Sequence, residues 1–407
     1  MRMSAEFQVF CLALRRPQSS DLITELRRIL AAEVEWDHIL DGARRHRVAS
    51  LLLSRLQRSG SPDLPARVVA ELRRQALIAA KESLAQMAEI GRLAPMFARA
   101  EVRVLGLKGV VLSAQLYGNP GLRNPRDIDL LVSPDEFASA EAVLLEAGYC
   151  HSGATLSPRQ TAAYRRWIKD VGYVNPVNGV RVELHHRLSD NPVLLPCDFD
   201  TLWREREEVE IAGATVAGLP RDKLALYLCA HGAGHSWEEL RWLLDFAAAL
   251  PEQNSSRAAV EMAERVGLGV AMLHALVLAH DWLGLCTDDQ QLARARANRH
   301  VARLNRVLAH FYDADAWYQS PERGTLAGLL RYSLWLRLYT YLIKTDWRYW
   351  GHQARREFIT PADWEVLHLP DALFWAFPIV RPVGWLIRQI KSRAHLRRGL
   401  PARKTNG

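Results

Sequence analysis

The stretch RNPRDIDLLV, residues 123–132, decides the fold expected for this chain. Its second half, DIDLLV, reads as a six-residue strand that follows a polar turn rich in Gly and Pro. Successive side chains of a strand point to opposite faces of the sheet. We therefore expect Asp127 and Asp129 on one face, while Ile128 and Leu130 point into the core.

The segments around this strand predict an α+β unit with a small mixed sheet. VRVLGLKG (102–109) is a short apolar run closed by glycine, and GVVLSAQLYG (109–118) has helical spacing. SPDEFASAEAVLLEAG (133–148) begins with a serine N-cap and a proline at the first helical position. Two hairpins are expected, in GYVNPVNGVRVELHHRL (172–188) and EVEIAGATVAGL (208–219).

Helical regions are expected on both sides of this unit. Apolar residues recur at 3–4 spacing before it, with a break at Ser59–Pro65, and again from Pro220 onward. The sequence therefore predicts four parts: an N-terminal helical region (1–98), the sheet unit (99–218), a C-terminal helical domain (219–370), and an amphipathic segment with a basic tail (371–407).

The composition is ordinary for a globular protein, with 49% hydrophobic and 24% charged residues among 407. No apolar run reaches the roughly 20 residues that cross a bilayer, and the N-terminus lacks the features of a signal peptide. The five cysteines are far apart and never form a CxxC pair. We therefore expect a reducing, cytoplasmic location and neither a disulfide framework nor a zinc ribbon.

The net charge of +8 comes from 53 basic and 45 acidic residues, and its location matters more than its size. Eight basic residues and no acidic residue lie between Arg381 and Lys404, so the rest of the chain is close to neutral. This distribution argues against a nucleic-acid-binding surface spread over the protein.

The C-terminal segment, residues 371–400, is first apolar and aromatic and then basic. Pro378, Arg381 and Pro382 exclude a simple transmembrane helix. We favour a C-terminal helix packed on the core with a disordered basic tail. The alternative is a weak contact of an interfacial helix with an anionic membrane surface.

Asp127 and Asp129 are about 7 Å apart along one strand, an unfavourable pair unless a cation lies between them. Mg²⁺ prefers hard oxygen ligands, often carboxylates together with substrate phosphates. Glu183 is the candidate third ligand, because it shares the polar face of its strand with Arg181 and His185. Three such acids could hold two ions about 4 Å apart.

Lys108 and Gly109 are candidates for binding phosphate. The glycine allows a sharp turn into a helix whose N-terminus attracts anions, and the lysine adds a full positive charge. Arg123 and Arg126 flank the loop before the strand and could neutralise charge on a transferring phosphoryl group. A single DxD or KG is common at strand ends and turns, but their combination in this order favours a functional site.

These residues resemble the nucleotidyltransferase superfamily with the DNA polymerase β-like palm. More narrowly, the chain is similar to bacterial nucleotidyltransferases marked by LKG, R-x-x-x-DIDLLV and an acidic-x-His strand. The matching residues here are Leu107–Gly109, Arg123–Val132 and Glu183–His185. A later H…W-x-x-D pattern is matched by His231, Trp242 and Asp245.

Two features depart from the broader superfamily. Lys108-Gly109 stands where Gly-Ser is usual, so the phosphate contacts must differ, and the third acid is Glu rather than Asp. His231 and His235 have the spacing of zinc ligands but lack the glutamate of HExxH. We expect His231 and Asp245 to line the cleft and bind the acceptor or base, or else to be structural. His185 is expected to support a metal-bound carboxylate or to be a satisfied structural histidine.

The resemblance implies a nucleotidyltransferase palm at residues 99–218 and transfer of a nucleoside monophosphate from an NTP, with ATP expected first. Mg²⁺ or Mn²⁺ would be held by Asp127, Asp129 and Glu183. The acceptor would be a small molecule, peptide or saccharide. Two alternatives stay open: a palm that binds a nucleotide or partner without turnover, and an RNA-directed nucleotidyltransferase, against which the near-neutral body argues. Nothing in the sequence indicates the oligomeric state.

Overall fold

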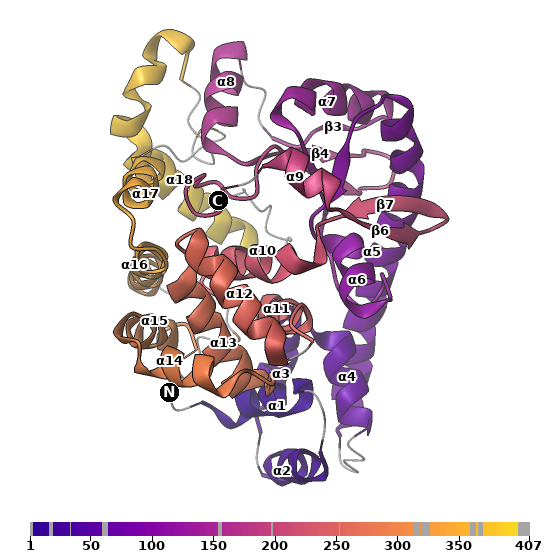
Figure 1. Ribbon diagram of the computed structural model, residues 1–407, viewed down its shortest axis with the longest axis vertical. Helices are drawn as coiled ribbons and strands as arrows, with labels where there is room; N and C mark the ends of the chain where they lie inside the picture. The colour runs from indigo at the N-terminus through magenta and orange to yellow at the C-terminus, as the bar shows by residue number, and fades with distance from the viewer. Residues whose placement is uncertain are drawn as a thin grey trace.

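The computed structural model describes residues 3–15, 19–32, 34–58, 64–153, 157–196, 198–251, 253–312, 318, 326–358, 364 and 369–397. Within these residues a mixed seven-stranded sheet lies between helices (Figure 1). This arrangement confirms the expected α+β class with a mixed sheet flanked by helices. All seven strands lie between Val104 and Gly218, while the predicted domain boundaries themselves stay a prediction.

The strands follow one another across the sheet in the order β3 (Cys150–His151), β4 (Asp170–Val174), β5 (Arg181–His185), β2 (Ile128–Val132), β1 (Val104–Gly106), β7 (Ala214–Gly218) and β6 (Glu207–Ile211). Both expected hairpins are present, as the antiparallel pairs β4–β5 and β6–β7. The central pair β2–β5 is parallel and places Asp129 opposite Glu183. This parallel register brings together carboxylates that are 54 positions apart in the chain.

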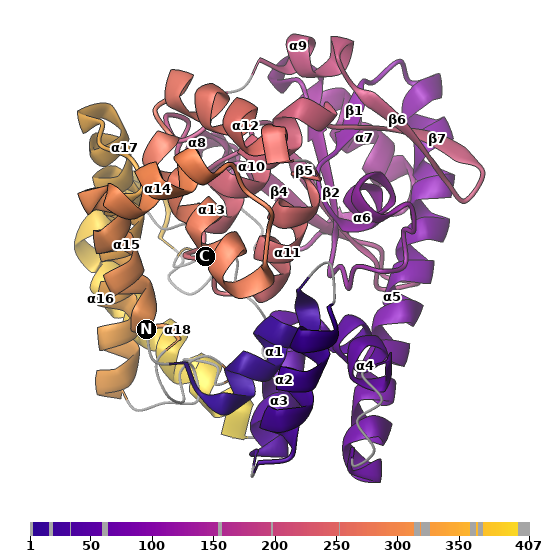
Figure 2. The same ribbon diagram turned by 60° about the horizontal axis from the view of Figure 1, so that its bottom comes forward.

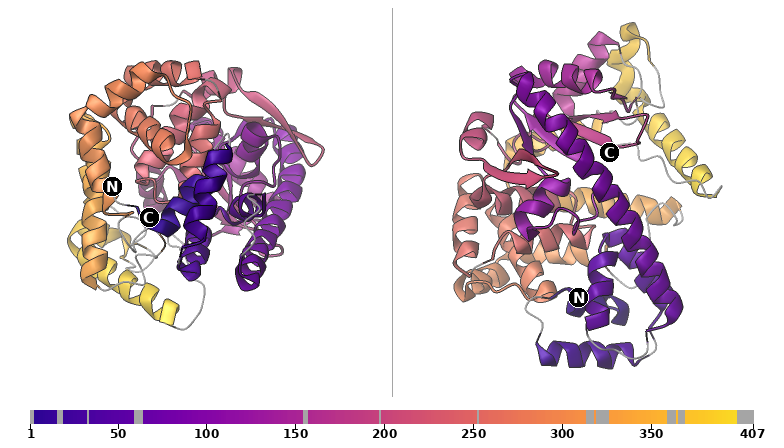
Figure 3. Two further views of the ribbon diagram at one scale, coloured as in Figure 1. Left: turned by 90° about the horizontal axis from the view of Figure 1, so that it is seen from below. Right: turned by 90° about the vertical axis from the view of Figure 1, so that its right-hand side faces the viewer.

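One face of the sheet is covered by α5 (Ala66–Arg99) and α7 (Phe137–Glu146). The apolar core of this face joins Ile90, Leu93 and Phe97 of α5 to Ile128 and Leu130 of β2. Figure 3 shows α5 as one long helix that runs from the N-terminal helices to the sheet. The faces predicted from the alternation in DIDLLV are therefore confirmed for the two apolar residues.

The opposite face of the sheet looks toward helices α10 (Arg221–Gly234), α11 (Leu240–Ala248) and α13 (Gly269–Leu283), as Figure 2 shows. A second apolar core joins strand residues such as Leu105 and Leu131 to Leu228 of α10 and Leu276 of α13. Asp129 and Glu183 belong to this face by the alternation of the strands. The C-terminal helical region therefore lies across from the acidic residues.

The remaining helices agree with the sequence pattern in most places. They are α1 (Ala5–Leu14), α2 (Ser20–Leu30), α3 (Trp36–His46), α4 (Ala49–Arg58), α6 (Gly109–Tyr117), α8 (Pro158–Trp167), α9 (Phe199–Arg204), α12 (Gln253–Arg265), α14 (Asp289–Ala297), α15 (Arg299–Ala309), α16 (Leu326–Leu342), α17 (Trp347–Phe358) and α18 (Phe377–Arg397). The expected break at Ser59–Pro65 separates α4 from α5, although residues 59–63 lie outside the described part of the chain.

The expected helix start at Ser133 differs in detail from the structure. A short 3₁₀ helix, η1 (Pro134–Glu136), precedes α7, and the Ser133 side chain makes no capping hydrogen bond. The proline does occupy the first turn, as predicted. Its fixed φ suits a tight turn as well as it suits an α-helix, so the sequence pattern does not distinguish the two.

The C-terminal helix α18 follows the 3₁₀ helix η4 (Asp371–Ala376) and lies at the periphery of the molecule (Figure 3). It is helical through Pro382, and Phe377 at its start is buried, but several of its other large apolar side chains are exposed instead of being packed on the core as expected. Ile379 is 71% exposed, Val383 54% and Ile390 59%. Residues 398–407, which include three of the eight basic residues counted from Arg381 onward, lie outside the described residues. Among the described helices, none combines the length and the hydropathy needed to span a bilayer.

The turn from α10 to α11 has a strained backbone. Ser236 (φ 52°) and Trp237 (φ 53°) are consecutive non-glycine residues in the left-handed region. The buried Trp237 ring packs directly over Gly232, where a Cβ atom would lie 2.2 Å from the nearest ring carbon. Gly232 is therefore required by packing, and the indole ring helps to hold the strained turn in place.

Replacement of Gly232 by alanine should lower the free energy of unfolding by about 2 kcal/mol, because the Trp237 ring must move out of a packed site. Gly234→Ala, two residues further along α10, is the matched control. A Cβ atom there would meet Leu194 at an ordinary 3.7 Å, so stability should change little. Urea unfolding of both variants tests this, and equal effects would show that the Trp237 contact is unimportant.

Candidate functional site

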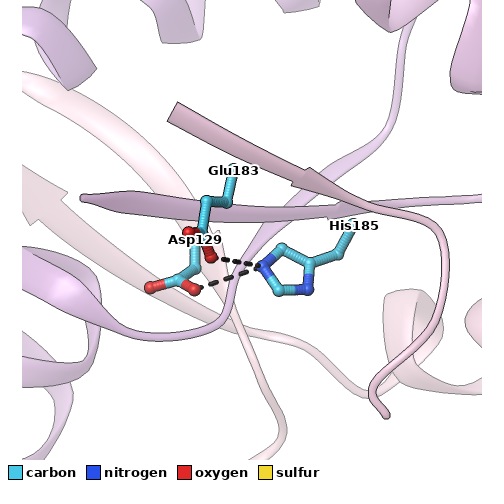
Figure 4. Close-up of side chains that lie close together, drawn as sticks. All are labelled: Asp129, Glu183 and His185. Atoms are coloured by element: carbon cyan, nitrogen blue, oxygen red, sulfur yellow. Dashed lines mark hydrogen bonds and ion pairs between the residues drawn. The ribbon is translucent and has the colours of Figure 1, made fainter. Parts of the chain in front are cut away.

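Three side chains on the face toward α10 and α11 converge at the centre of the sheet. One ligand atom from each of Asp129, Glu183 and His185 lies within 4.8 Å of the others. His185 Nε2 is 3.1 Å from Asp129 Oδ1 and 3.7 Å from Glu183 Oε2. Figure 4 shows both carboxylates turned toward the same ring nitrogen. Among the described residues, this is the one group of three or more side chains that could hold a metal ion.

Asp129 is almost completely buried, with 2% of its surface exposed, yet it is well compensated. Lys108 Nζ lies 2.8 Å from its Oδ1, and His185 contacts the same oxygen. Burial opposes ionisation, but the Lys108 charge and the His185 hydrogen bond hold the pKa of Asp129 well below its usual range. Asp129 is therefore an anion that already has one cationic neighbour.

Glu183 and Asp127 are in the opposite situation. Burial first, and then the charges of Asp170, Asp127 and Asp129, raise the pKa of Glu183 well above its usual value. Burial and the Asp129 charge likewise raise the pKa of Asp127. These carboxylates are crowded and undercompensated, which is the condition that a bound divalent cation relieves. The carboxylate oxygens fit Mg²⁺ or Mn²⁺, and His185 is within hydrogen-bonding distance of one of them.

Of the predicted site residues Asp127, Asp129 and Glu183, the structure places Asp129 opposite Glu183 on the paired strands β2 and β5. Asp127 is not part of the tight group formed by Asp129, Glu183 and His185. Its role as a metal ligand therefore stays a prediction. His185 lies within hydrogen-bonding distance of Asp129. The sequence had left open whether His185 supports a metal-bound carboxylate or is a satisfied structural histidine.

Asp170, the first residue of β4, is a fourth acid that sequence reasoning missed. It pairs with His185 across the β4–β5 hairpin, and its Oδ2 is 3.7 Å from His185 Nδ1. The adjacent Lys169 ammonium contacts the same carboxylate. The register from Asn175 and Val180, which flank the turn, would have placed Asp170 opposite His185. The sequence would therefore have predicted the pairing of Asp170 with His185 if the length of the turn had been known.

Gly109 begins α6 and fixes the relation between Lys108 and Asp127. Its φ is +66°, and a Cβ atom there would lie 3.0 Å from the Asp127 carbonyl oxygen. Gln86 of α5, with its amide oriented to satisfy both groups, hydrogen-bonds the Asp127 backbone N–H at 3.3 Å and its carbonyl at 3.2 Å. Glycine is therefore needed both for the left-handed turn and for the close approach of the two segments.

Arg123 and Asp245 form a buried ion pair that the sequence did not predict. Arg123 Nε donates to Asp245 Oδ2 at 2.7 Å, and the Tyr117 hydroxyl donates to the other oxygen at 3.0 Å. The two ionic side chains are only 3% and 1% exposed. In this structure the pair ties the loop before β2 to α11. The proposed roles in binding nucleotide and acceptor stay predictions for both residues.

Arg126 lies at the other end of the loop and is half exposed. Its nearest acidic neighbour is Glu239, at 3.8 Å. Arg241 of α11 donates to Glu239 at 2.9 Å and to the Asn124 carbonyl at 2.7 Å. Arg47, which caps α3, donates to the Asn124 side chain at 3.0 Å. Arg47 and Arg241 were not recognised from the sequence, because they lie in helical segments with ordinary spacing.

His231 and His235 lie on one side of α10 and pack against Trp242. Their ring centroids are 4.8 Å apart, and each lies within 5.2 Å of the indole centroid. Burial first, and then the Lys108 charge, lower the pKa of His231 well below its usual value. Burial and Lys169 lower the pKa of His235 to about 4. Both rings are therefore neutral at physiological pH and lie within electrostatic reach of Lys108 and Lys169.

The sequence model of a family described as "Uncharacterised nucleotidyltransferase" matches residues 32–284, more than half of the chain. The chain belongs to this nucleotidyltransferase family. The matched region includes the whole sheet and all of the acidic residues described above. No curated protein and no solved structure matches. Within the region that the family model matches, the carboxylates of β2 and β5 are the groups around which an active site can be built.

Removal of one partner of the Arg123–Asp245 pair should be strongly destabilising. Asp245→Ala leaves a buried guanidinium without its counterion, so the free energy of unfolding should fall by about 3–5 kcal/mol. Arg123→Met should have a similar cost for the converse reason. Together the two substitutions should lower the free energy of unfolding by clearly less than the sum of their separate effects. A double-mutant cycle measured by urea unfolding tests this.

The exposed pair of Arg28 and Glu25 provides the control for this cycle. Glu25→Ala should leave the unfolding midpoint unchanged, because both side chains remain solvated without the contact. Strictly additive losses for Arg123 and Asp245 would mean that the buried pair does not couple the loop to α11.

Proposed function

We propose that this chain transfers a nucleoside monophosphate from an NTP to a hydroxyl or phosphate of an acceptor, in a metal-dependent reaction. The main support is the pairing of Asp129 with Glu183 across the parallel strands β2 and β5, with Asp127 beside them. Carboxylates that are gathered and desolvated on one sheet face are unfavourable, because the neighbouring charges raise the pKa of Glu183. In a member of a nucleotidyltransferase family, this arrangement favours catalysis over simple binding.

Asp127, Asp129 and Glu183 would hold Mg²⁺ or Mn²⁺, which supplies the positive charge that activates the attacking oxygen and stabilises the leaving group. His185 would donate from Nε2 to Asp129 and keep that carboxylate in one orientation. Asp170 lies on the other side of the ring, near Nδ1. A histidine held between two acids is a positioning group in this scheme rather than a group that reacts.

Lys108 and Gly109 would place positive charge at the phosphates. The Lys108 ammonium is already near the carboxylates, and the adjacent N-terminus of α6 adds the positive end of a helix dipole. The acceptor oxygen forms a bond to the α-phosphorus while the bond to the bridging oxygen of pyrophosphate breaks, and the acceptor proton leaves to water. Most of the rate would come from positioning and electrostatics.

The neutral rings of His231 and His235, together with Trp242, would form the wall that contacts the base or the acceptor. Uncharged aromatic rings suit stacking with a planar base. We expect ATP first among the nucleotides and a small molecule, peptide or saccharide as acceptor. The near-neutral body of the chain argues against RNA.

Incubation with Mg²⁺ or Mn²⁺ and each labelled NTP, against pools of acceptors, should release pyrophosphate in the wild type. Asp129→Asn and Glu183→Gln should each lower this rate by at least about 100-fold, because the site loses charge that the reaction requires. Asp135→Asn, which changes an exposed acid just after β2, is the matched control and should retain full activity. Equal rates in all four proteins would exclude the assigned site.

A weak contact with an anionic membrane surface is a separate proposal, supported by α18. The exposed residues Ile379, Val383, Leu386 and Ile390 recur at helical spacing and form one apolar stripe. The same segment carries basic residues and no acidic residue from Arg381 onward. An apolar stripe with basic flanks is the pattern of a helix that lies in the interface of an anionic bilayer.

The full-length protein should therefore sediment with vesicles that contain phosphatidylserine and much less with neutral vesicles. Ile379→Ser combined with Ile390→Ser should reduce the bound fraction severalfold, because the stripe loses apolar area. Leu84→Ser combined with Leu145→Ser removes two exposed leucines elsewhere and should have no effect. Binding that is unchanged in the α18 variant would contradict this proposal.

A further inference from the structure

Three arginines from three parts of the chain meet beside Asp127. Arg47 comes from the end of α3, Arg126 from the loop before β2 and Arg241 from the first turn of α11. Arg47 and Arg241 both donate to Asn124, one to the side chain and the other to the carbonyl oxygen. We call these three residues the arginine cluster. Its members gather around a single loop although their positions differ by up to 194 in the chain.

The arginine cluster has more positive charge than its neighbours compensate. Glu239 is shared by Arg241, at 2.9 Å, and Arg126, at 3.8 Å. Arg47 has no carboxylate within ion-pair distance among the described residues. Arg123, the fourth arginine nearby, is matched by Asp245 and adds no net charge. Three guanidinium groups therefore face one glutamate on this side of Asp127.

Two members of the arginine cluster, Arg47 and Arg241, are largely withdrawn from water, and Arg241 is also partly unsatisfied. Arg47 is 8% exposed and has a left-handed backbone, with φ 58°. The Arg241 side chain is 12% exposed, and its buried Nε has no hydrogen-bond partner among the described residues. Burial first, and then neighbouring arginine charge, lower the pKa of both residues. Buried like charges with open donors are unfavourable unless an anion completes the site.

We propose that Arg47, Arg126 and Arg241 bind the β- and γ-phosphates of the nucleotide and hold the pyrophosphate as it leaves. This inference rests on the proposed function. Guanidinium groups match phosphate oxygens with paired, charge-assisted hydrogen bonds, and Asn124 fixes two of the three in place. Asp127 joins the arginine cluster to the other carboxylates, because it directly follows Arg126 and stands two residues before Asp129, which pairs with Glu183.

This assignment gives the bound triphosphate a direction. The α-phosphate would lie at Asp127, Asp129 and Glu183, and the rest of the triphosphate would extend toward α3 and α11. When the bond from the α-phosphorus breaks, its electron pair passes to the pyrophosphate, and the arginine cluster lies where that negative charge develops. Glu239 would give up part of its contact with Arg241 and Arg126 to the incoming phosphates.

The test is the binding of inorganic tripolyphosphate by calorimetry, with EDTA present so that no cation at the carboxylates contributes. Arg126→Ala and Arg241→Lys should each weaken tripolyphosphate binding by about 10- to 100-fold, the usual effect of losing charge-assisted hydrogen bonds. AMP should bind equally to all proteins, because it has neither the β- nor the γ-phosphate. Arg126 is half exposed, so its replacement does not threaten folding.

Arg73→Ala is the matched control, since it removes an exposed arginine of α5 and should leave binding unchanged. Asp129→Asn should retain tripolyphosphate binding even where nucleotidyl transfer is lost. Tripolyphosphate binding that depends on the arginine cluster, in a protein without transferase activity, would support the anion site and overturn the proposed function. Pyrophosphate release together with unchanged binding in the Arg126 and Arg241 variants would overturn the assignment of the arginine cluster.

Discussion

The mutual repulsion of carboxylates on one face of the sheet is the constraint on which this site depends. Asp127, Asp129, Asp170 and Glu183 lie on or beside three adjacent strands, and the charges of the first three raise the pKa of Glu183. Three groups partly compensate these negative charges. Lys108 contacts Asp129, Lys169 contacts Asp170, and the His185 ring lies between Asp129 and Asp170. The compensation is uneven, because it stabilises the Asp129 anion while the pKa of Glu183 stays high. The remaining excess is what a divalent cation would neutralise.

The sequence predicted those parts of the structure that depend on local periodicity. The alternation in DIDLLV placed Ile128 and Leu130 in the core, and the Asn178-Gly179 turn predicted the hairpin that carries Glu183. The sequence did not predict contacts that arise when distant segments pack. Arg123 and Asp245 are 122 positions apart, and nothing in either segment marks it as half of a buried pair. Asp170 was missed because its face depends on the register of a turn whose length was not known.

The helical regions supply side chains to the site, and a strained turn between α10 and α11 helps to position them. Ser236 and Trp237 adopt left-handed backbones between α10 and α11, and each such residue costs on the order of 1–3 kcal/mol. The Trp237 ring on Gly232 and the hydrogen bond from the Tyr312 hydroxyl to the Trp237 carbonyl hold this turn. The turn ends at Glu239 and Arg241, so packing on the far side of α10 sets the position of charges that face the loop before β2.

Acidic side chains predominate at β2 and β5, where Lys108 and Lys169 partly offset them, and guanidinium groups predominate toward α3 and α11, where Glu239 partly offsets them. This uneven distribution of charge favours one orientation of a cation-bound triphosphate. The cation belongs with the carboxylates, and the uncoordinated phosphate oxygens belong with the arginines. In the proposed reaction, the α-phosphorus then lies near Asp127, which stands between Arg126 and Asp129 in the chain. An acceptor must approach from the side opposite the leaving pyrophosphate, which for an in-line displacement is away from the arginine cluster.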